Sequence, residues 1–140
     1  MAMNVVVTAK QVLSVGTPVV VESESPAAPL AVVFEDDGET GYFYALDPSV
    51  TAQPIVDALH IYNVVSVSDR DRPSTVEIGW SPDSLKVVLF INGFPHAIFD
   101  FSASRGYCRT GYPPPTEDGP WSSHSHAWSD KALEHFGAAP

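Results

Sequence analysis

Hydrophobic and polar positions alternate in short runs along the chain, which is typical of β-strands separated by turns. Valine triplets at 5–7 and 19–21 predict the first two strands. Residues 23–29 hold two prolines and show no periodicity, so they predict a loop. The chain therefore opens as β structure.

A β-hairpin is expected from residues 31–36 and 39–46, across the Asp-Gly pair at 37–38. Asp-Gly supplies the positive backbone angles of a type I′ turn. A two-residue loop would place Val33 opposite Tyr42. Both faces of this ribbon are apolar, so we expect it inside a sheet and not at an edge.

A three-stranded antiparallel meander is expected over residues 75–101, and an Asn-Gly turn between its last two strands fixes the register. Counting from the turns places Ile78, Val87 and Ile98 on one core face, with His96 beside them. The opposite face is too apolar to lie bare, so another layer or a partner should cover part of it.

A short helix is expected at 53–62, because Pro54 suits a first helical turn and the apolar residues that follow have the spacing of one helix face. A strand beginning at Leu59 is the alternative. Residues 64–68 are expected to return to β structure, and the charged residues 69–73 to form an exposed turn.

The last third of the chain divides into a long loop and a helix. Residues 102–127 show no periodicity and predict an ordered, irregular loop held by its aromatic side chains. Residues 128–136 predict a C-terminal helix, with Ser129 as its cap and Gly137 as its stop. One apolar stripe on this helix can dock on a sheet.

These elements predict one α+β domain over residues 1–140, with a mostly antiparallel sheet of about seven or eight short strands and two short helices on one side. Met1-Ala2 are expected to be a cloning addition before a native start at Met3. The single cysteine argues against a disulfide framework, and no apolar run could span a bilayer. Without a signal-peptide pattern, we expect a cytoplasmic protein.

Charge narrows the classes of partner. The chain has 17 carboxylates against 7 lysines and arginines, for a net charge of −10. It has no basic residue between Lys10 and Arg70, so it lacks the basic stripe that a nucleic-acid binder needs. Charge of this sign favours encounter with a basic protein partner, although it also serves solubility.

The most conspicuous charged feature is the acidic tip of the first hairpin, formed by Glu35, Asp36, Asp37 and Glu39. Such a cluster can be a solvated turn, a contact for a basic partner, or a site for a hard cation. The spacing is not that of an EF-hand loop. The solvated turn is the leading interpretation.

Two histidines, His124 and His126, would point the same way from an extended segment, a spacing used by zinc and iron sites. No spacing selects a third ligand among the remaining candidates, which are Cys108, His96, His60, Asp118 and His135. A surface loop rich in serine and histidine is the simpler reading, and we expect no cofactor.

Cys108 lies between Arg105 and Arg109, and two nearby guanidinium groups would make a thiol reactive. The same arginines are more simply explained as partners of carboxylates. His96 is more simply a hydrogen-bonded interior histidine than a catalyst. Phosphate-loop, nucleophile-elbow, HExxH and spaced-cysteine motifs are all missing from the sequence, so the case for an enzyme is thin.

Four segments, 34–47 (FEDDGETGYFYALD), 57–64 (DALHIYNV), 91–101 (INGFPHAIFDF) and 106–109 (GYCR), resemble a family of small bacterial proteins, domain-of-unknown-function family 2251. The resemblance covers most of the chain from about residue 32. It implies a bacterial origin and a free-standing single domain, and it brings no activity, cofactor or catalytic residue.

Two functions from different classes follow. The first is a non-catalytic acidic module that binds a basic protein partner, as immunity or inhibitor proteins do. The second is a small enzyme or ligand-binding domain with a pocket formed by residues 106–128 over the sheet, where Trp121 is a binding candidate. The second apolar face of the meander also invites a homodimer.

Overall fold

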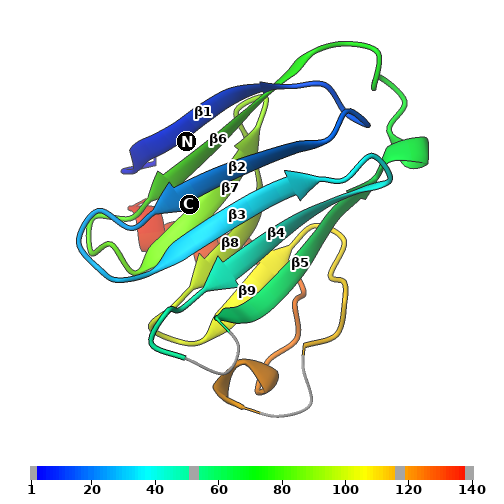
Figure 1. Ribbon diagram of the computed structural model, residues 1–140. Helices are drawn as coiled ribbons and strands as arrows, with labels where there is room; N and C mark the ends of the chain where they lie inside the picture. Colours follow the sequence, from blue (N-terminus) through cyan, green and yellow to red (C-terminus); the bar gives the residue numbers. More distant parts are fainter. Residues whose placement is uncertain (1–2, 51–53, 116–118, 138–140) are drawn as a thin grey trace.

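A computed structural model describes residues 3–50, 54–115 and 119–137 and builds them into two antiparallel β-sheets, one in front of the other in Figure 1. The five-stranded sheet has the order β1-β6-β7-β8-β9, and the four-stranded sheet has the order β2-β3-β4-β5. The strands are β1 Val6–Leu13, β2 Val19–Glu24, β3 Ala31–Asp36, β4 Thr40–Leu46, β5 Ile55–Asn63, β6 Ser74–Trp80, β7 Lys86–Ile91, β8 Phe94–Asp100 and β9 Arg105–Cys108. Short 3₁₀ helices follow as η1 Val64–Ser66, η2 Pro120–Ser122 and η3 Asp130–Phe136. The mostly antiparallel fold is confirmed.

The main core lies between the two sheets. In β3 and β4 every second residue is buried, which is the alternation of strands with one face on a core. Phe43 of the four-stranded sheet stacks on Phe99 of the other at 5.1 Å between ring centroids. The Trp80 indole donates a hydrogen bond of 2.9 Å to the Ser23 hydroxyl across the same interface. The sheets are therefore joined by aromatic packing and by a buried hydrogen bond.

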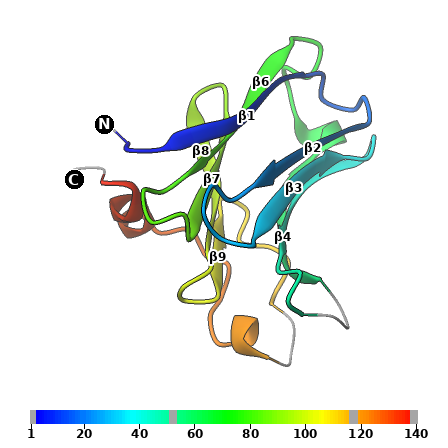
Figure 2. The same ribbon diagram turned by 60° about the vertical axis from the view of Figure 1, so that its left-hand side comes forward.

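The outer face of the five-stranded sheet carries a second, smaller core. Val88 and Ile98 pack there against Leu133 and Phe136 of η3. Figure 2 shows η3, in red, against this sheet and next to the N-terminal strand. The second apolar face of the meander is thus covered by η3 of the same chain. The sequence had predicted that another layer or a partner would cover part of it. Within the part of the chain that the structure describes, no helix is long and apolar enough to cross a membrane.

The C-terminal helix occurs where it was expected, but it is a 3₁₀ helix. The Ser129 hydroxyl accepts a hydrogen bond from the Lys131 N–H, and Gly137 adopts the left-handed conformation with φ of 71°. The cap and stop residues therefore act as predicted.

The predicted register of the third meander strand is wrong. Ile91 does face Phe94 across the Asn-Gly turn, but a β-bulge follows, and Val87 then faces Phe99. Pro95 sits at this bulge, and proline has no N–H to give to the ladder. A shift of one residue turns every later side chain over. Ile98 consequently lies on the outer face and not beside Val87.

The two other turns shift the register by two residues, which leaves the faces as predicted. In the first hairpin Val33 faces Tyr44, because Asp37 accepts hydrogen bonds from the backbone of a four-residue loop. Trp80 likewise faces Val87 across the β6–β7 turn. The first hairpin lies in the interior of its sheet, as expected.

The predicted helix at 53–62 is wrong, because residues Ile55–Asn63 form strand β5; residue 53 lies outside the described residues. Positions 57, 59 and 61 are buried in alternation, but position 57 is an aspartate, which hid the period of two. The predicted strand at 64–68 is instead the 3₁₀ turn η1, whereas residues 69–73 do form an exposed turn.

The predicted loop at 102–127 is interrupted by strand β9, which pairs with β8. Beyond it, Cys108 and Ala127 form an isolated parallel bridge. Four residues holding a glycine and a cysteine are too short to show a period. Residues 116–118 of this segment lie outside the described residues.

Candidate functional site

The edge strands β5 and β9 lie side by side, one from each sheet (Figure 1). A buried pair of side chains joins β5, which holds Asp57, to the segment beside β9: His126 precedes Ala127, which forms a bridge with Cys108 at the end of β9. The His126 Nε2 atom lies 2.9 Å from both carboxylate oxygens of Asp57. Gly106 of β9 makes this approach possible, since a Cβ at Gly106 would lie 2.8 Å from the Asp57 Oδ2 atom.

Both ring nitrogens of His126 face acceptors. Nδ1 faces the Pro113 carbonyl, which can only accept, and Nε2 faces the Asp57 carboxylate. The imidazolium form satisfies both contacts by donating twice. Burial lowers the pKa of His126, but the hydrogen bond and charge of Asp57 outweigh it, so the pKa lies above its ordinary value. His126 and Asp57 therefore form a buried ion pair that joins β5 of the four-stranded sheet to the segment beside β9.

Further hydrogen bonds to backbone carbonyls hold the segment after β9 in place near this ion pair. The Thr110 hydroxyl donates to the His60 carbonyl at 2.7 Å, and the His60 N–H donates to the Tyr112 carbonyl at 2.8 Å. The Cys108 N–H donates to the His126 carbonyl at 3.0 Å. The segment after β9 is therefore fastened to the edge of the four-stranded sheet.

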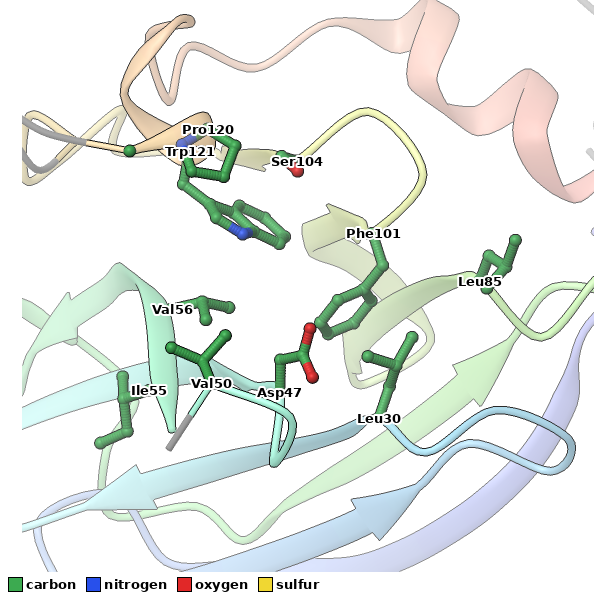
Figure 3. Close-up of a pocket in the computed structure, with 11 residues that line it drawn as sticks. Leu30, Asp47, Val50, Ile55, Val56, Leu85, Phe101, Ser104, Pro120 and Trp121 are labelled. Carbon is green, nitrogen blue, oxygen red and sulfur yellow. The ribbon is translucent and has the colours of Figure 1, made fainter. Parts of the chain in front are cut away.

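A pocket of about 500 Å³ opens beside this joint, at the end of the sandwich, between strand ends and turns of both sheets. Its walls are largely apolar. Figure 3 shows Val56 of β5 facing Trp121 of η2, with Leu30 and Leu85, which directly precede β3 and β7, on the side of Phe101. Trp121 contacts Phe101 edge-to-face at 5.5 Å between ring centroids. The pocket wall is thus continuous with the aromatic core.

Asp47 is the charged side chain among the described residues that line the pocket, and it stands on the turn after β4. The Ser49 N–H and hydroxyl donate to its Oδ1 atom at 3.0 and 2.6 Å. In Figure 3 its carboxylate points toward the ring of Phe101. The pocket therefore combines apolar walls with one anchored carboxylate.

The sequence had placed a pocket under residues 106–128, and one of its candidates, Trp121, does line the cavity. Sequence reasoning missed Asp47 and Phe101, which directly follow β4 and β8 at the rim. A polar residue directly after an apolar strand, as in Leu46-Asp47-Pro48, was the available signal. No local sequence pattern showed that the end of β4, which Asp47 follows, lies near the end of β8, which Phe101 follows.

The candidate thiol is buried and away from both arginines that flank it in sequence. The Cys108 Sγ atom contacts the Thr110 hydroxyl and the Tyr112 carbonyl, each at 3.5 Å. Arg109 is held between aromatic rings, with its guanidinium carbon 4.5 Å from the Phe94 centroid and 3.8 Å from the Trp128 centroid.

Arg105 stacks over the Tyr107 ring at 4.5 Å. Among the described residues neither Arg105 nor Arg109 forms an ion pair, and the two arginines do not gather around the thiol. Arg105 and Arg109 thus pack on aromatic rings, and they do not form a common site with Cys108.

The candidate histidines also stand apart. His124 is exposed, whereas His126 is buried. His96 lies half-buried on the outer face with Phe94 against its ring, where burial and then the charge of Arg109 lower its pKa. Among the described residues no three His, Cys, Asp or Glu side chains are grouped to hold a metal ion; Asp118 lies outside them.

The carboxylates at the acidic hairpin tip differ in their exposure to solvent. Asp36 is fully buried, where it accepts hydrogen bonds from the Gly16 and Gly38 N–H groups and from the Tyr62 hydroxyl. Burial and this contact raise the pKa of Tyr62. Asp37 and Glu39 are exposed, and the Asp37 carboxylate is occupied by the turn.

The outer face of the four-stranded sheet carries aromatic and acidic side chains. Tyr42 stacks on Tyr44 at 5.8 Å and meets His60 edge-on at 5.4 Å. Glu35 pairs across the ladder with Tyr42, and Glu22 is exposed on neighbouring β2. Burial, and then the charge of Glu35, raises the pKa of Tyr44. We call these five side chains the aromatic-acidic face.

The fold and the pocket define the chain as a two-sheet antiparallel β-protein with a cavity at one end. It belongs to the family described as "Uncharacterized protein conserved in bacteria (DUF2251)", whose family model matches residues 13–137. It is 47% identical over 116 residues to an "Uncharacterized protein" of Haemophilus influenzae, which covers 82% of this chain and 72% of that protein. No solved structure matches the chain significantly. The family resemblance is confirmed, and it carries no activity.

Proposed function

We propose that the protein is a small-molecule-binding domain whose ligand occupies the pocket at the end of the sandwich. The observation that carries this proposal is a cavity of about 500 Å³ with apolar and aromatic walls and one anchored carboxylate. Ligand sites in proteins typically measure about 300–1,000 Å³ and combine apolar walls with a few fixed polar groups.

Binding without catalysis is the function that the lining favours. Its polar side chains among the described residues are Asp47 and Ser104, and neither forms a hydrogen bond with a described histidine or cysteine. General acid–base or nucleophilic chemistry needs such a pair within hydrogen-bond reach. The lining thus supports recognition more than reaction.

The test uses N-phenyl-1-naphthylamine, a neutral apolar dye that fluoresces when shielded from water. The protein is expected to bind it in a one-to-one complex. A Val56→Trp variant, which fills the pocket from β5, should lose this binding. A Val65→Trp variant adds the same side chain at an exposed position on η1 and should keep it. Absent binding, or equal binding by both variants, would overturn the proposal.

A second candidate function is the binding of a basic protein partner on the aromatic-acidic face. In Figures 1 and 2 no other labelled strand lies over this face of the four-stranded sheet. Tyrosine rings attract cations through their faces, and Glu22 and Glu35 add negative charge. Charge complementarity therefore points to a lysine- and arginine-rich segment of a partner.

The partner hypothesis is tested by capture from a bacterial lysate at low salt, followed by titration of the purified partner. That partner should be basic, and its dissociation constant should rise with salt concentration. Glu22→Lys and Glu35→Lys should weaken binding, whereas Glu134→Lys, with the same charge change on η3, should affect it less. Equal weakening by all three substitutions, or no basic partner, would contradict it.

Two further expectations carry over as proposals. A homodimer through the second apolar face of the meander was expected from the sequence; because η3 covers that face, we propose a monomer instead, and light scattering tests it. A cytoplasmic location is proposed, which agrees with a single cysteine that cannot form an internal disulfide, and cell fractionation tests it.

A further inference from the structure

We infer that the ligand of the pocket is an organic cation, an ammonium group attached to a small apolar body. This inference rests on the proposed function, because it assumes that the pocket takes a ligand. It adds the charge and the position of that ligand: the ammonium lies against Asp47 and beside the contacting rings of Phe101 and Trp121, and the apolar body fills the remaining walls.

Asp47 is held in a fixed position by its own turn. Its N–H donates to the Pro54 carbonyl at 2.8 Å, and its carbonyl accepts from the Val50 N–H at 3.0 Å. The backbone N–H and the hydroxyl of Ser49 both donate to the Asp47 Oδ1 atom, at 3.0 and 2.6 Å. The Oδ2 atom has no hydrogen-bond partner among the described residues. Within residues 3–50, 54–115 and 119–137, one oxygen is therefore anchored and the other has no donor, so it can accept from a ligand.

No lysine or arginine of the chain neutralises this carboxylate. All seven are described, and the ion pair that they form among the described residues is Lys86 with Asp83. Asp47 is half-buried beside apolar side chains. A carboxylate that a ligand seals from water is costly unless a positive group pairs with it. A neutral or anionic ligand of the same size would leave the Asp47 carboxylate desolvated and without a positive partner.

The aromatic side chains near Asp47 favour the same ligand. Trp121 lies edge-to-face with Phe101, with an interplanar angle of 82°, so their ring planes stand almost at right angles. Figure 3 shows both rings and the Asp47 carboxylate directed into the pocket. Ring faces attract ammonium groups, and tryptophan attracts them most strongly. Trp80 covers one face of Phe101, on which it stacks at 6.0 Å between ring centroids. The carboxylate and the ring surfaces that remain directed into the pocket therefore form one wall of a cation site.

The experiment compares three soluble probes that share a phenyl-ethyl body: phenethylammonium, 2-phenylethanol and 3-phenylpropionate. Dissociation constants are measured by titration calorimetry at pH 7. The cation is expected to bind at least about tenfold more tightly than the alcohol, the effect of one hydrogen bond to a charged group. The anion is expected to bind more weakly than the alcohol.

The Asp47→Asn variant is the decisive control. Its amide oxygen can still accept both hydrogen bonds from Ser49, so the turn should keep its shape. In this variant the preference for the cation over the alcohol should vanish. Glu134→Gln removes one exposed carboxylate from η3 and should retain the preference.

Each outcome separates the two proposals. Equal binding of cation and alcohol, or tighter binding of the anion, overturns the inference and leaves the pocket as a ligand site. A preference for the cation that survives Asp47→Asn also overturns it. If none of the probes nor the naphthylamine dye binds, the proposed function itself fails.

Discussion

Replacing His126 with alanine is expected to cost the protein about 3–5 kcal/mol of unfolding free energy, the usual effect of breaking a buried ion pair. The histidine is 2% exposed and Asp57 5% exposed, so neither has water as an alternative partner. At the observed 2.9 Å, Coulomb attraction amounts to about 6 kcal/mol for an effective dielectric constant near 20. The substitution removes that attraction and leaves a buried carboxylate unpaired.

Urea denaturation followed by tryptophan fluorescence measures this loss. With a slope of about 2 kcal/mol per molar urea, the midpoint should fall by roughly 2 M. His124→Ala is the matched control, because it removes an exposed histidine two residues away and should change stability by less than about 0.5 kcal/mol. Asp57→Asn should cost less than His126→Ala, since its amide oxygen can still accept from Nε2.

A loss below about 1 kcal/mol for His126→Ala would refute this reasoning. It would mean that the joint between β5 and β9 does not depend on the pair. Equal losses for His124→Ala and His126→Ala would refute it as well, because they would trace the effect to the loop in general.

Three other outcomes follow from the same structure. The pKa of His126 is raised above its ordinary value of 6.5, so the stability that the pair contributes is full below pH 6.5 and is lost as pH rises through the folded-state pKa. The difference in unfolding free energy between wild type and His126→Ala should therefore shrink as pH rises above 6.5. The lowered pKa of His96 acts in the opposite direction, and taking this difference cancels it; a constant difference would contradict the account. Gly106→Ala should cost about 1–3 kcal/mol, because its Cβ would meet Asp57, and urea titration showing no loss would count against the close approach of β5 and β9. Phe136→Ala should cost about 3–5 kcal/mol by opening the second core, against a near-neutral Glu134→Ala; similar values for both would mean that η3 is not a real cover.

The parts of the fold that sequence predicted are those governed by local rules. The Asp-Gly and Asn-Gly turns mark two hairpins, and valine-rich alternation marks most strands. The cap at Ser129 and the stop at Gly137 are likewise local, and both act as expected. In each case the residues that decide the structure lie within a few positions of one another.

The failures have long-range causes. Strand β5 was taken for a helix because Asp57 occupies a buried position, and that position is tolerable because His126, 69 residues away, supplies the charge. The face of Ile98 was wrong because one bulge beside Pro95 reverses all later side chains. The burial of a charge and the position of a bulge both depend on residues that are distant in the sequence, so a local pattern does not predict them.

The candidate site was predicted in outline only. A pocket formed by residues 106–128 over the sheet was expected, and Gly119, Pro120 and Trp121 of that segment line the observed cavity. A binding role for Trp121 stays a prediction. Asp47 reaches this cavity because the end of β4 and the segment after β8 meet at the same end of the sandwich. That meeting is set by the topology of two sheets, which the one-dimensional pattern does not specify.

The most direct test of a cation-binding pocket is a nuclear magnetic resonance titration of ¹⁵N-labelled protein with phenethylammonium. We expect saturable shifts concentrated at the Trp121 indole N–H and at the backbone N–H groups of Asp47 and Phe101. The same titration of Asp47→Asn should require at least about tenfold more ligand. Shifts confined to Tyr42 and Tyr44 on the opposite surface, or no saturable shifts, would contradict the account.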